Sequence, residues 1–327
     1  MIAPFVEKNV FYADITKMMI ACGIPLYKLK SVEFKSFFEK YVQESLPDES
    51  TLRKNYVKDC YESVLEKIRL EIGESPIFVS IDETTDKAGR SVTNVIVGPL
   101  RESGRGYLLT VEVLDKVNSS TIATLFDDSM HIFNIQREKV LVFVTDAAPY
   151  MKKSASSLKL LYPNMIHITC VAHGVHRVCE SLRSKYSDVD VLISNLKKVF
   201  LKSPFRVAVF KEMEPNLPLP PQPVITRWGT WLIAAVYYAE NYDSIKRIID
   251  QITDDAACVR FSKQLLSKKS VQGNLIYIKC NFGFLLEEKV FERLQKTGTP
   301  VGEVLNILDN IEKRLIEAQG KIVTVLT

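Results

Sequence analysis

Residues 79–86 read VSIDETTD, and this stretch decides the fold class. It ends a short, nearly continuous apolar run that begins at Pro76, which is the pattern of a buried strand closed by Asp82. Residues 142–148 read VFVTDAA, so a second apolar run closes at a second acid, Asp146. Two buried strands that each end in an aspartate predict an α/β fold with acids at the carboxyl ends of its strands.

The residues around these two runs predict the element order βββαβαβ. Strands rich in apolar and β-branched residues are expected over 76–81, 91–97, 107–113, 139–145 and 165–169, and helices over 121–133 and 147–161. Glycine and proline residues separate the first three strands, which favours an antiparallel meander. We predict a mixed sheet in which the first and fourth strands are neighbours, so that Asp82 and Asp146 emerge side by side.

Three segments are predicted along the chain. Residues 1–74 form an N-terminal helical region, in which apolar residues four apart indicate a helix over 51–72 with Ser50 as its N-cap. Residues 75–214 form the core that contains the sheet. A proline cluster begins at 215, so residues 215–327 are predicted as a Pro-rich linker and part of an all-α insertion domain. Helices are expected over 178–203, 228–249, 256–266 and 301–318.

The composition indicates a protein with a packed core and no membrane segment. The 327 residues are 46% hydrophobic and 25% charged, and no stretch reaches the roughly 20 uncharged apolar residues that a membrane helix needs. The six cysteines are spread over a long chain without the spacing of a disulfide framework, which favours reduced thiols in the cytosol or nucleus. The formal net charge of +4 is mild for a protein that binds nucleic acid.

The two strand-end aspartates suit a divalent metal. Mg²⁺ and Mn²⁺ take hard oxygen ligands, and a pair of such ions about 3.5 to 4 Å apart can activate the attacking oxygen and stabilise the leaving oxygen in phosphodiester cleavage. A second interpretation stays open, in which Asp82 and Asp146 only organise turns and helix starts. Asp146 precedes a predicted helix directly, as an N-cap would.

Several short motifs, taken in order, resemble the hAT superfamily of DNA transposases. Residues 46–47 and 50–53 read LP and STLR, and the acid-bearing stretches follow as IDETTD at 81–86 and VTDAA at 144–148. Beyond them, residues 170–173 read CVAH and residues 226–228 read TRW, which resemble the Cys-x-x-His and Arg-Trp elements of the family. The last four motifs are specific together, and the resemblance covers most of the chain.

The resemblance implies a ribonuclease H-like core that cleaves and joins DNA strands. Asp82 and Asp146 would be the first two acids of a three-carboxylate site for Mg²⁺ or Mn²⁺, and Arg227 and Trp228 would bind DNA, with Trp228 near a hairpin or flipped base. Cys170 and His173 would form a structural motif, with His173 close to a phosphate. DNA would be the partner and the nucleus the location.

The third acid of that family is a glutamate beyond a long helical insertion, and no motif of this sequence matches it. The family's C-terminal dimerisation segment, through which a homo-oligomer would form, is also not found here, nor is its N-terminal zinc finger. We therefore expect a transposase-derived protein that is catalytically incomplete as it stands. The alternative is a domesticated, non-catalytic nuclear scaffold that binds DNA or proteins.

Some further residues allow a functional and a structural interpretation. On a helix, each step of three residues turns about 300°, so the row Cys170, His173, His176 and Cys179 spreads around the circumference and zinc is not expected there. Two lysine groups offer phosphate contacts, although a solvated helix face is favoured for both. They are Lys152, Lys153 and Lys159, and Lys197, Lys198 and Lys202. Trp231, Tyr237 and Tyr238 are predicted core residues, whereas base stacking and core packing stay equally open for Trp228.

Overall fold

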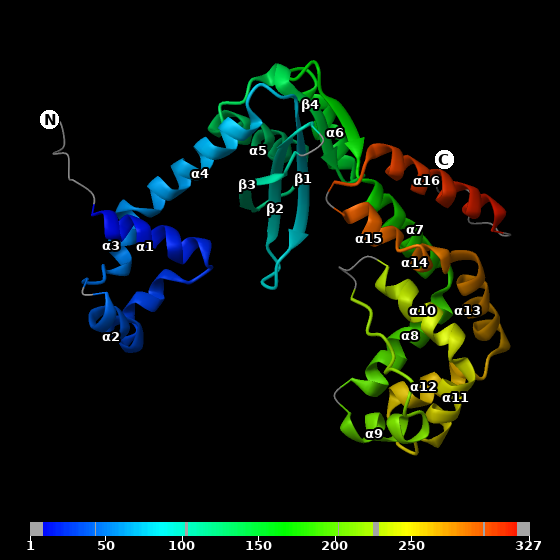
Figure 1. Ribbon diagram of the computed structural model, residues 1–327. Helices are drawn as coiled ribbons and strands as arrows, with labels where there is room; N and C mark the ends of the chain where they lie inside the picture. The colour runs from blue at the N-terminus through cyan, green and yellow to red at the C-terminus, as the bar shows by residue number, and fades with distance from the viewer. Residues whose placement is uncertain are drawn as a thin grey trace. The chain divides into compact units, whose positions relative to one another are not determined.

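The computed structural model of the chain describes residues 9–42, 44–101, 104–201, 203–224, 229–296 and 298–318 (Figure 1). The chain divides into two compact units. The sheet unit comprises Met1–Phe143 and Ser156–Ile166, and the helical unit comprises Val144–Ala155 and His167–Thr327. The predicted segment boundaries at 74 and 214 stay predictions.

The sheet unit begins with short helices around a small apolar core. They are α1 (Val10–Ala21), η1 (Leu26–Lys30), α2 (Val32–Tyr41), α3 (Glu49–Asn55) and α4 (Val57–Ile72). The predicted helix over 51–72 is wrong in two details. Its N-cap is Asp48, whose carboxylate accepts the Ser50 N–H at 2.8 Å, and the helix breaks at Tyr56. The Tyr56 ring is buried and its hydroxyl accepts the Asn9 N–H at 3.2 Å, so a tertiary contact interrupts a regular helical pattern.

Five strands form one mixed sheet with a ribonuclease H-like arrangement, in the order β3-β2-β1-β4-β5. The strands are β1 (Ile77–Thr85), β2 (Ser91–Pro99), β3 (Tyr107–Leu114), β4 (Val140–Thr145) and β5 (Ile166–Thr169). The first three form the predicted antiparallel meander, and a register shift between Val95 and Ile96 leaves Leu109 of β3 as an extra residue. The strand order confirms the prediction that the first and fourth strands are neighbours. The helices α5 (Ser119–Ile132) and α6 (Pro149–Leu158) complete the element order βββαβαβ. The short η2 (Arg137–Lys139) leads into β4.

Aromatic packing fixes the core of the sheet unit. The ring of Phe126 meets the rings of Phe143 and Tyr162 edge to face, at centroid distances of 4.8 and 5.0 Å. The Tyr162 hydroxyl donates to Asp127 at 2.6 Å, so this buried phenol keeps a polar partner. These contacts join α5 to β4 through side chains that are almost completely buried.

The helical unit packs its helices around one large apolar core, which includes Leu192, Leu232, Ile245 and Leu275. The helices are α7 (Val171–Lys185), α8 (Ser187–Phe200), α9 (Pro204–Met213), α10 (Thr230–Glu240), α11 (Tyr242–Gln251), α12 (Ala257–Leu266), α13 (Lys269–Phe282), α14 (Phe284–Glu287), α15 (Val290–Gln295) and α16 (Val301–Glu317). Two predicted helices are split, 178–203 at Tyr186 and 228–249 at Asn241. In the described part of the chain, no helix combines the length and the apolar character needed to cross a membrane.

Candidate functional site

Asp82 lies on β1, but inside the strand rather than at its end. β1 continues to Thr85, and Asp82 pairs in register with Asn94 of β2. Along the strand, Val79 and Ile81 are buried whereas Asp82 is exposed, as the alternation of a half-buried strand requires. The prediction that Asp82 closes the strand is therefore wrong, because hairpin pairing with β2 extends β1 beyond its apolar run.

Asp86, the fifth residue of the DETTD motif, stabilises the turn that joins β1 to β2. Its Oδ1 accepts the backbone N–H groups of Ala88 and Arg90 at 2.8 and 2.9 Å, and the Arg90 guanidinium pairs with its Oδ2. The backbone N–H of Arg90 and then its side chain hold the pKa of Asp86 below its usual value. Asp86 thus closes the β1–β2 hairpin as a charged turn residue.

Asp146 follows β4 directly and precedes α6. Its Oδ1 accepts the backbone N–H of Ala148 at 3.0 Å, which fixes the turn before the helix begins at Pro149. The turn-organising interpretation of Asp146 therefore describes one of its carboxylate contacts. A carboxylate that accepts one backbone N–H retains further lone pairs, so this contact is compatible with metal ligation.

The residue before Asp146 belongs to a hydrogen-bond chain that the sequence does not reveal. Thr145 is buried, with 1% of its surface exposed, and its hydroxyl lies 2.7 Å from the backbone oxygen of Asp146 and 2.9 Å from Nε2 of His167 on β5. Burial, and then the charge of Lys152, lowers the pKa of His167, which favours its neutral form. Thr145 and His167 stand 22 positions apart, and only the pairing of β4 with β5 brings them together.

The structure brings Cys170 and His173 together at the start of α7. The backbone N–H of Cys170 donates to the Thr145 oxygen at 2.7 Å, and Cys170 is the N-cap residue of the helix. Burial alone would raise the pKa of the Cys170 thiol. Hydrogen bonds from the side chain and backbone of His173 outweigh that effect, so the pKa of the thiol lies below its usual value. The Cys170 backbone therefore anchors the end of β4 to the start of α7, and the Cys170 thiol contacts His173.

The other two members of the Cys/His row differ from this pair. Burial lowers the pKa of His176 and raises the pKa of the Cys179 thiol to about 12. A thiol with such a raised pKa stays protonated at neutral pH, and the thiolate is the form that ligates metals. Within the described ranges, no group of three or more histidine, cysteine, aspartate or glutamate side chains is arranged to hold a metal ion.

Residues 47–199 match the family model described as Domain of unknown function (DUF659). The matched segment begins before α3, includes the whole sheet and ends in α8. That family is typical of transposase-related proteins, and the match supports a transposase-related origin for this segment. A search of curated proteins gave no match.

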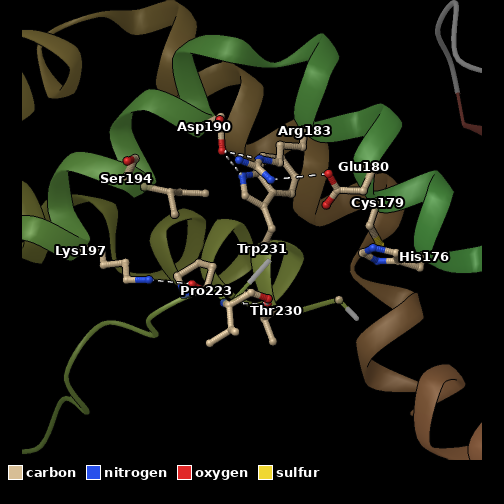
Figure 2. A pocket seen from close by; sticks show the side chains of 13 residues that line it. His176, Cys179, Glu180, Arg183, Asp190, Ser194, Lys197, Pro223, Thr230 and Trp231 are labelled. Carbon is tan, nitrogen blue, oxygen red and sulfur yellow. Dashed lines mark hydrogen bonds and ion pairs between the residues drawn. The ribbon is translucent and has the colours of Figure 1, made fainter. Parts of the chain in front are cut away.

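A pocket of about 130 Å³ lies in the helical unit between α7, α8 and the start of α10. Figure 2 shows the Trp231 indole directed at Asp190, whose Oδ1 accepts the indole N–H at 3.0 Å and the Arg183 Nε–H at 2.8 Å. Arg183 also contacts Glu180 at 3.5 Å. Trp231 and Tyr238 are buried and Tyr237 packs beside them, so the prediction of core positions is confirmed for these aromatic residues.

Arg227 and Trp228 lie outside the described residues, so their predicted DNA contacts stay predictions. Val224 and Gly229, which flank residues 225–228 in the sequence, both line the pocket. The Thr230 hydroxyl donates to the Val224 oxygen at 2.9 Å, and Lys197 Nζ donates to the Pro223 oxygen at 2.8 Å. The chain on either side of the Arg-Trp element is therefore bound to α8 and α10.

The lysines predicted near the site have identifiable contacts of their own. Lys159 Nζ donates to the backbone oxygens of Pro163 and Met165, at 2.8 and 2.6 Å. Lys152 lies close enough to His167 to affect its pKa. Lys202 lies outside the described residues. Lys159 and Lys197 thus have structural contacts with backbone oxygens, and phosphate contacts by any of these lysines stay a prediction.

Proposed function

We propose that this chain is a hAT-type, transposase-derived protein that binds DNA in the nucleus through a ribonuclease H-like core. Asp82 and Asp146 would be two of the carboxylate ligands for Mg²⁺ or Mn²⁺ in DNA strand cleavage and transfer. The observation that carries the proposal is the sheet order, in which the strand bearing Asp82 neighbours the strand that Asp146 follows. The DUF659 match over the same segment supports it.

The chemistry of the donor set fits a hard divalent cation. Both residues offer carboxylate oxygens, which Mg²⁺ and Mn²⁺ prefer over nitrogen or sulfur. When bound, such ions supply activation of the attacking oxygen and stabilisation of the leaving oxygen. The protein's own part is to hold the two carboxylates, of which Asp146 is fixed by the Ala148 N–H. Because the resemblance implies three acids, we propose that cleavage requires a third carboxylate in addition to these two.

The proposal is tested first by Mn²⁺ binding. Asp82→Asn and Asp146→Asn keep the shape of each side chain but remove its charge. We expect each substitution to weaken Mn²⁺ binding, measured by titration calorimetry, by more than about 10-fold. The matched control is Glu112→Gln on β3, an exposed acid at the far edge of the sheet, which should leave the affinity unchanged. Unchanged binding in either aspartate variant, or no Mn²⁺ binding by the native chain, would contradict the proposal.

The second readout is strand cleavage of hairpin and nicked DNA with Mg²⁺ or Mn²⁺. If a third carboxylate completes the site and the protein is active, cleavage should require the metal ion. It should then disappear in both Asp82→Asn and Asp146→Asn. Cleavage that survives both substitutions would exclude a role for these acids. DNA binding with no metal dependence at all would instead support the non-catalytic nuclear scaffold.

A further inference from the structure

We propose that Thr145 and His167 are positioning residues that hold Asp146 in place for metal binding, an inference that rests on the proposed function. The three residues form a chain of contacts within the helical unit, from the imidazole on β5 through the Thr145 hydroxyl to the Asp146 peptide oxygen. None of the motifs that resemble the transposase family contains His167.

The direction of this chain follows from the number of protons available. A threonine hydroxyl has one proton to donate, and here it is donated to the backbone oxygen of Asp146 at 2.7 Å. The same hydroxyl oxygen lies 2.9 Å from Nε2 of His167, so it accepts a hydrogen bond from the tautomer that carries its proton on Nε2. The imidazole is therefore the donor that completes the hydrogen bonding of Thr145, and Thr145 in turn completes that of Asp146.

A second contact fixes the main chain at the same point. The backbone oxygen of Thr145 accepts the Cys170 N–H at 2.7 Å, where β5 passes into α7. Thr145 is thus held by its side chain and by its backbone. Asp146 is held at its peptide oxygen by Thr145 and at its carboxylate by the Ala148 N–H. Metal ligands need positions fixed within about 0.5 Å, and contacts behind a ligand commonly provide that precision.

Because Thr145 is buried, this series of hydrogen bonds is sensitive to the loss of its single hydroxyl. Thr145 is 1% exposed, so water cannot readily replace its hydroxyl. Removing the hydroxyl would leave the imidazole N–H and the Asp146 oxygen without this partner, which such groups tolerate poorly. The turn that carries the Asp146 carboxylate could then rotate, and metal affinity would fall even though the carboxylate itself is intact.

The test compares a substitution that removes each group with one that keeps its hydrogen bond. Thr145→Val removes the hydroxyl at nearly constant shape, and Thr145→Ser keeps it. His167→Leu removes the N–H donor, and His167→Gln retains an N–H at a similar reach. We expect Thr145→Val and His167→Leu to weaken Mn²⁺ binding by about 10- to 100-fold, and Thr145→Ser and His167→Gln to stay near the native affinity. In the double variant Thr145→Val/His167→Leu, the two losses of Mn²⁺ affinity should not add, because both residues act on Asp146 through the same series of hydrogen bonds.

Circular dichroism and urea unfolding separate this effect from misfolding. His167 is only half-buried, so its variants provide the test if Thr145→Val does not fold. Native Mn²⁺ affinity in folded Thr145→Val and His167→Leu, beside a lost affinity in Asp146→Asn, would overturn the positioning role and leave the proposed function standing. Native affinity in Asp146→Asn would overturn the proposed function, and the positioning role with it.

Discussion

Cys170 and Cys179 lie on the same helix segment, yet their thiols have opposite pKa shifts. Cys170 is half-buried at the N-cap and its pKa is lowered by His173, whereas Cys179 is 1% exposed and burial raises its pKa to about 12. Only the thiolate reacts readily with alkylating reagents, so the two positions should differ in chemical reactivity.

This difference gives a prediction for iodoacetamide labelling. Near pH 8, Cys170 should be alkylated well before Cys179, as followed by peptide mass spectrometry. His173→Ala removes the side-chain hydrogen bond that contributes most to lowering the Cys170 pKa and keeps the backbone contacts, so the curve of Cys170 labelling rate against pH should move to higher pH. His131→Ala, at an exposed histidine on α5, should leave that curve in place. Equal labelling of the two cysteines would contradict the assigned pKa directions.

The sequence shows some of the site residues and hides others for a physical reason. Asp82 and Asp146 stand out because each interrupts an apolar run. Thr145 looks like any β-branched strand residue, and His167 lies in a short strand with no motif around it. Their partnership depends on which strands pair, and pairing between strands 22 positions apart is not encoded in local periodicity.

At the scale of elements, periodicity predicts helices and strands well but not where a long helix breaks. Tyr56 and Tyr186 end helices without a proline or glycine at either position. Each side chain has a tertiary contact instead, Tyr56 with Asn9 and Tyr186 with the Tyr277 ring at 6.1 Å. Such breaks arise from packing against residues far away in the sequence, so a local pattern continues across them.

Two glycines in the helical unit should respond to alanine in opposite directions. Gly229 precedes α10 with φ of +71°, and an added Cβ would lie 2.7 Å from a ring carbon of Phe291. Gly273 lies inside α13, where an added Cβ meets nothing within 4 Å. We expect Gly229→Ala to lower the free energy of unfolding by about 1–2 kcal/mol or more, and Gly273→Ala to raise it by about 0.5–1 kcal/mol.

Urea unfolding of both variants beside the native chain measures these changes. Because both substitutions add the same methyl group, the comparison isolates backbone conformation and local space. A neutral or stabilising Gly229→Ala would show that the left-handed conformation and the Phe291 contact do not constrain the start of α10.

For the whole molecule, each compact unit has buried aromatic residues of its own. Phe126 belongs to the core of the sheet unit and Phe282 to the core of the helical unit, and both are fully buried. Removing either ring creates a cavity that costs about 3–5 kcal/mol. The two substitutions should lower the local stability of different parts of the protein.

Hydrogen exchange followed by mass spectrometry can locate these losses. Phe282→Ala should reduce amide protection in α10 and α13 and leave the protection of β2 close to native. Phe126→Ala should reduce the protection of β2 and leave that of α10 and α13 close to native. Phe37→Ala, at a ring that is 57% exposed, should change neither region. A uniform loss of protection in both core variants would indicate that the chain opens as a single cooperative body.

The register shift between β2 and β3 has a consequence for the behaviour of the protein in concentrated solution. β3 is an outermost strand in the sheet order, and edge strands invite the edges of other molecules to pair with them. The extra residue Leu109 interrupts the even spacing of backbone donors and acceptors along this edge, and the exposed Glu112 would have to lose its hydration in any such pairing. The irregularity at Leu109 and the hydration of Glu112 therefore oppose the sideways growth of the sheet into aggregates.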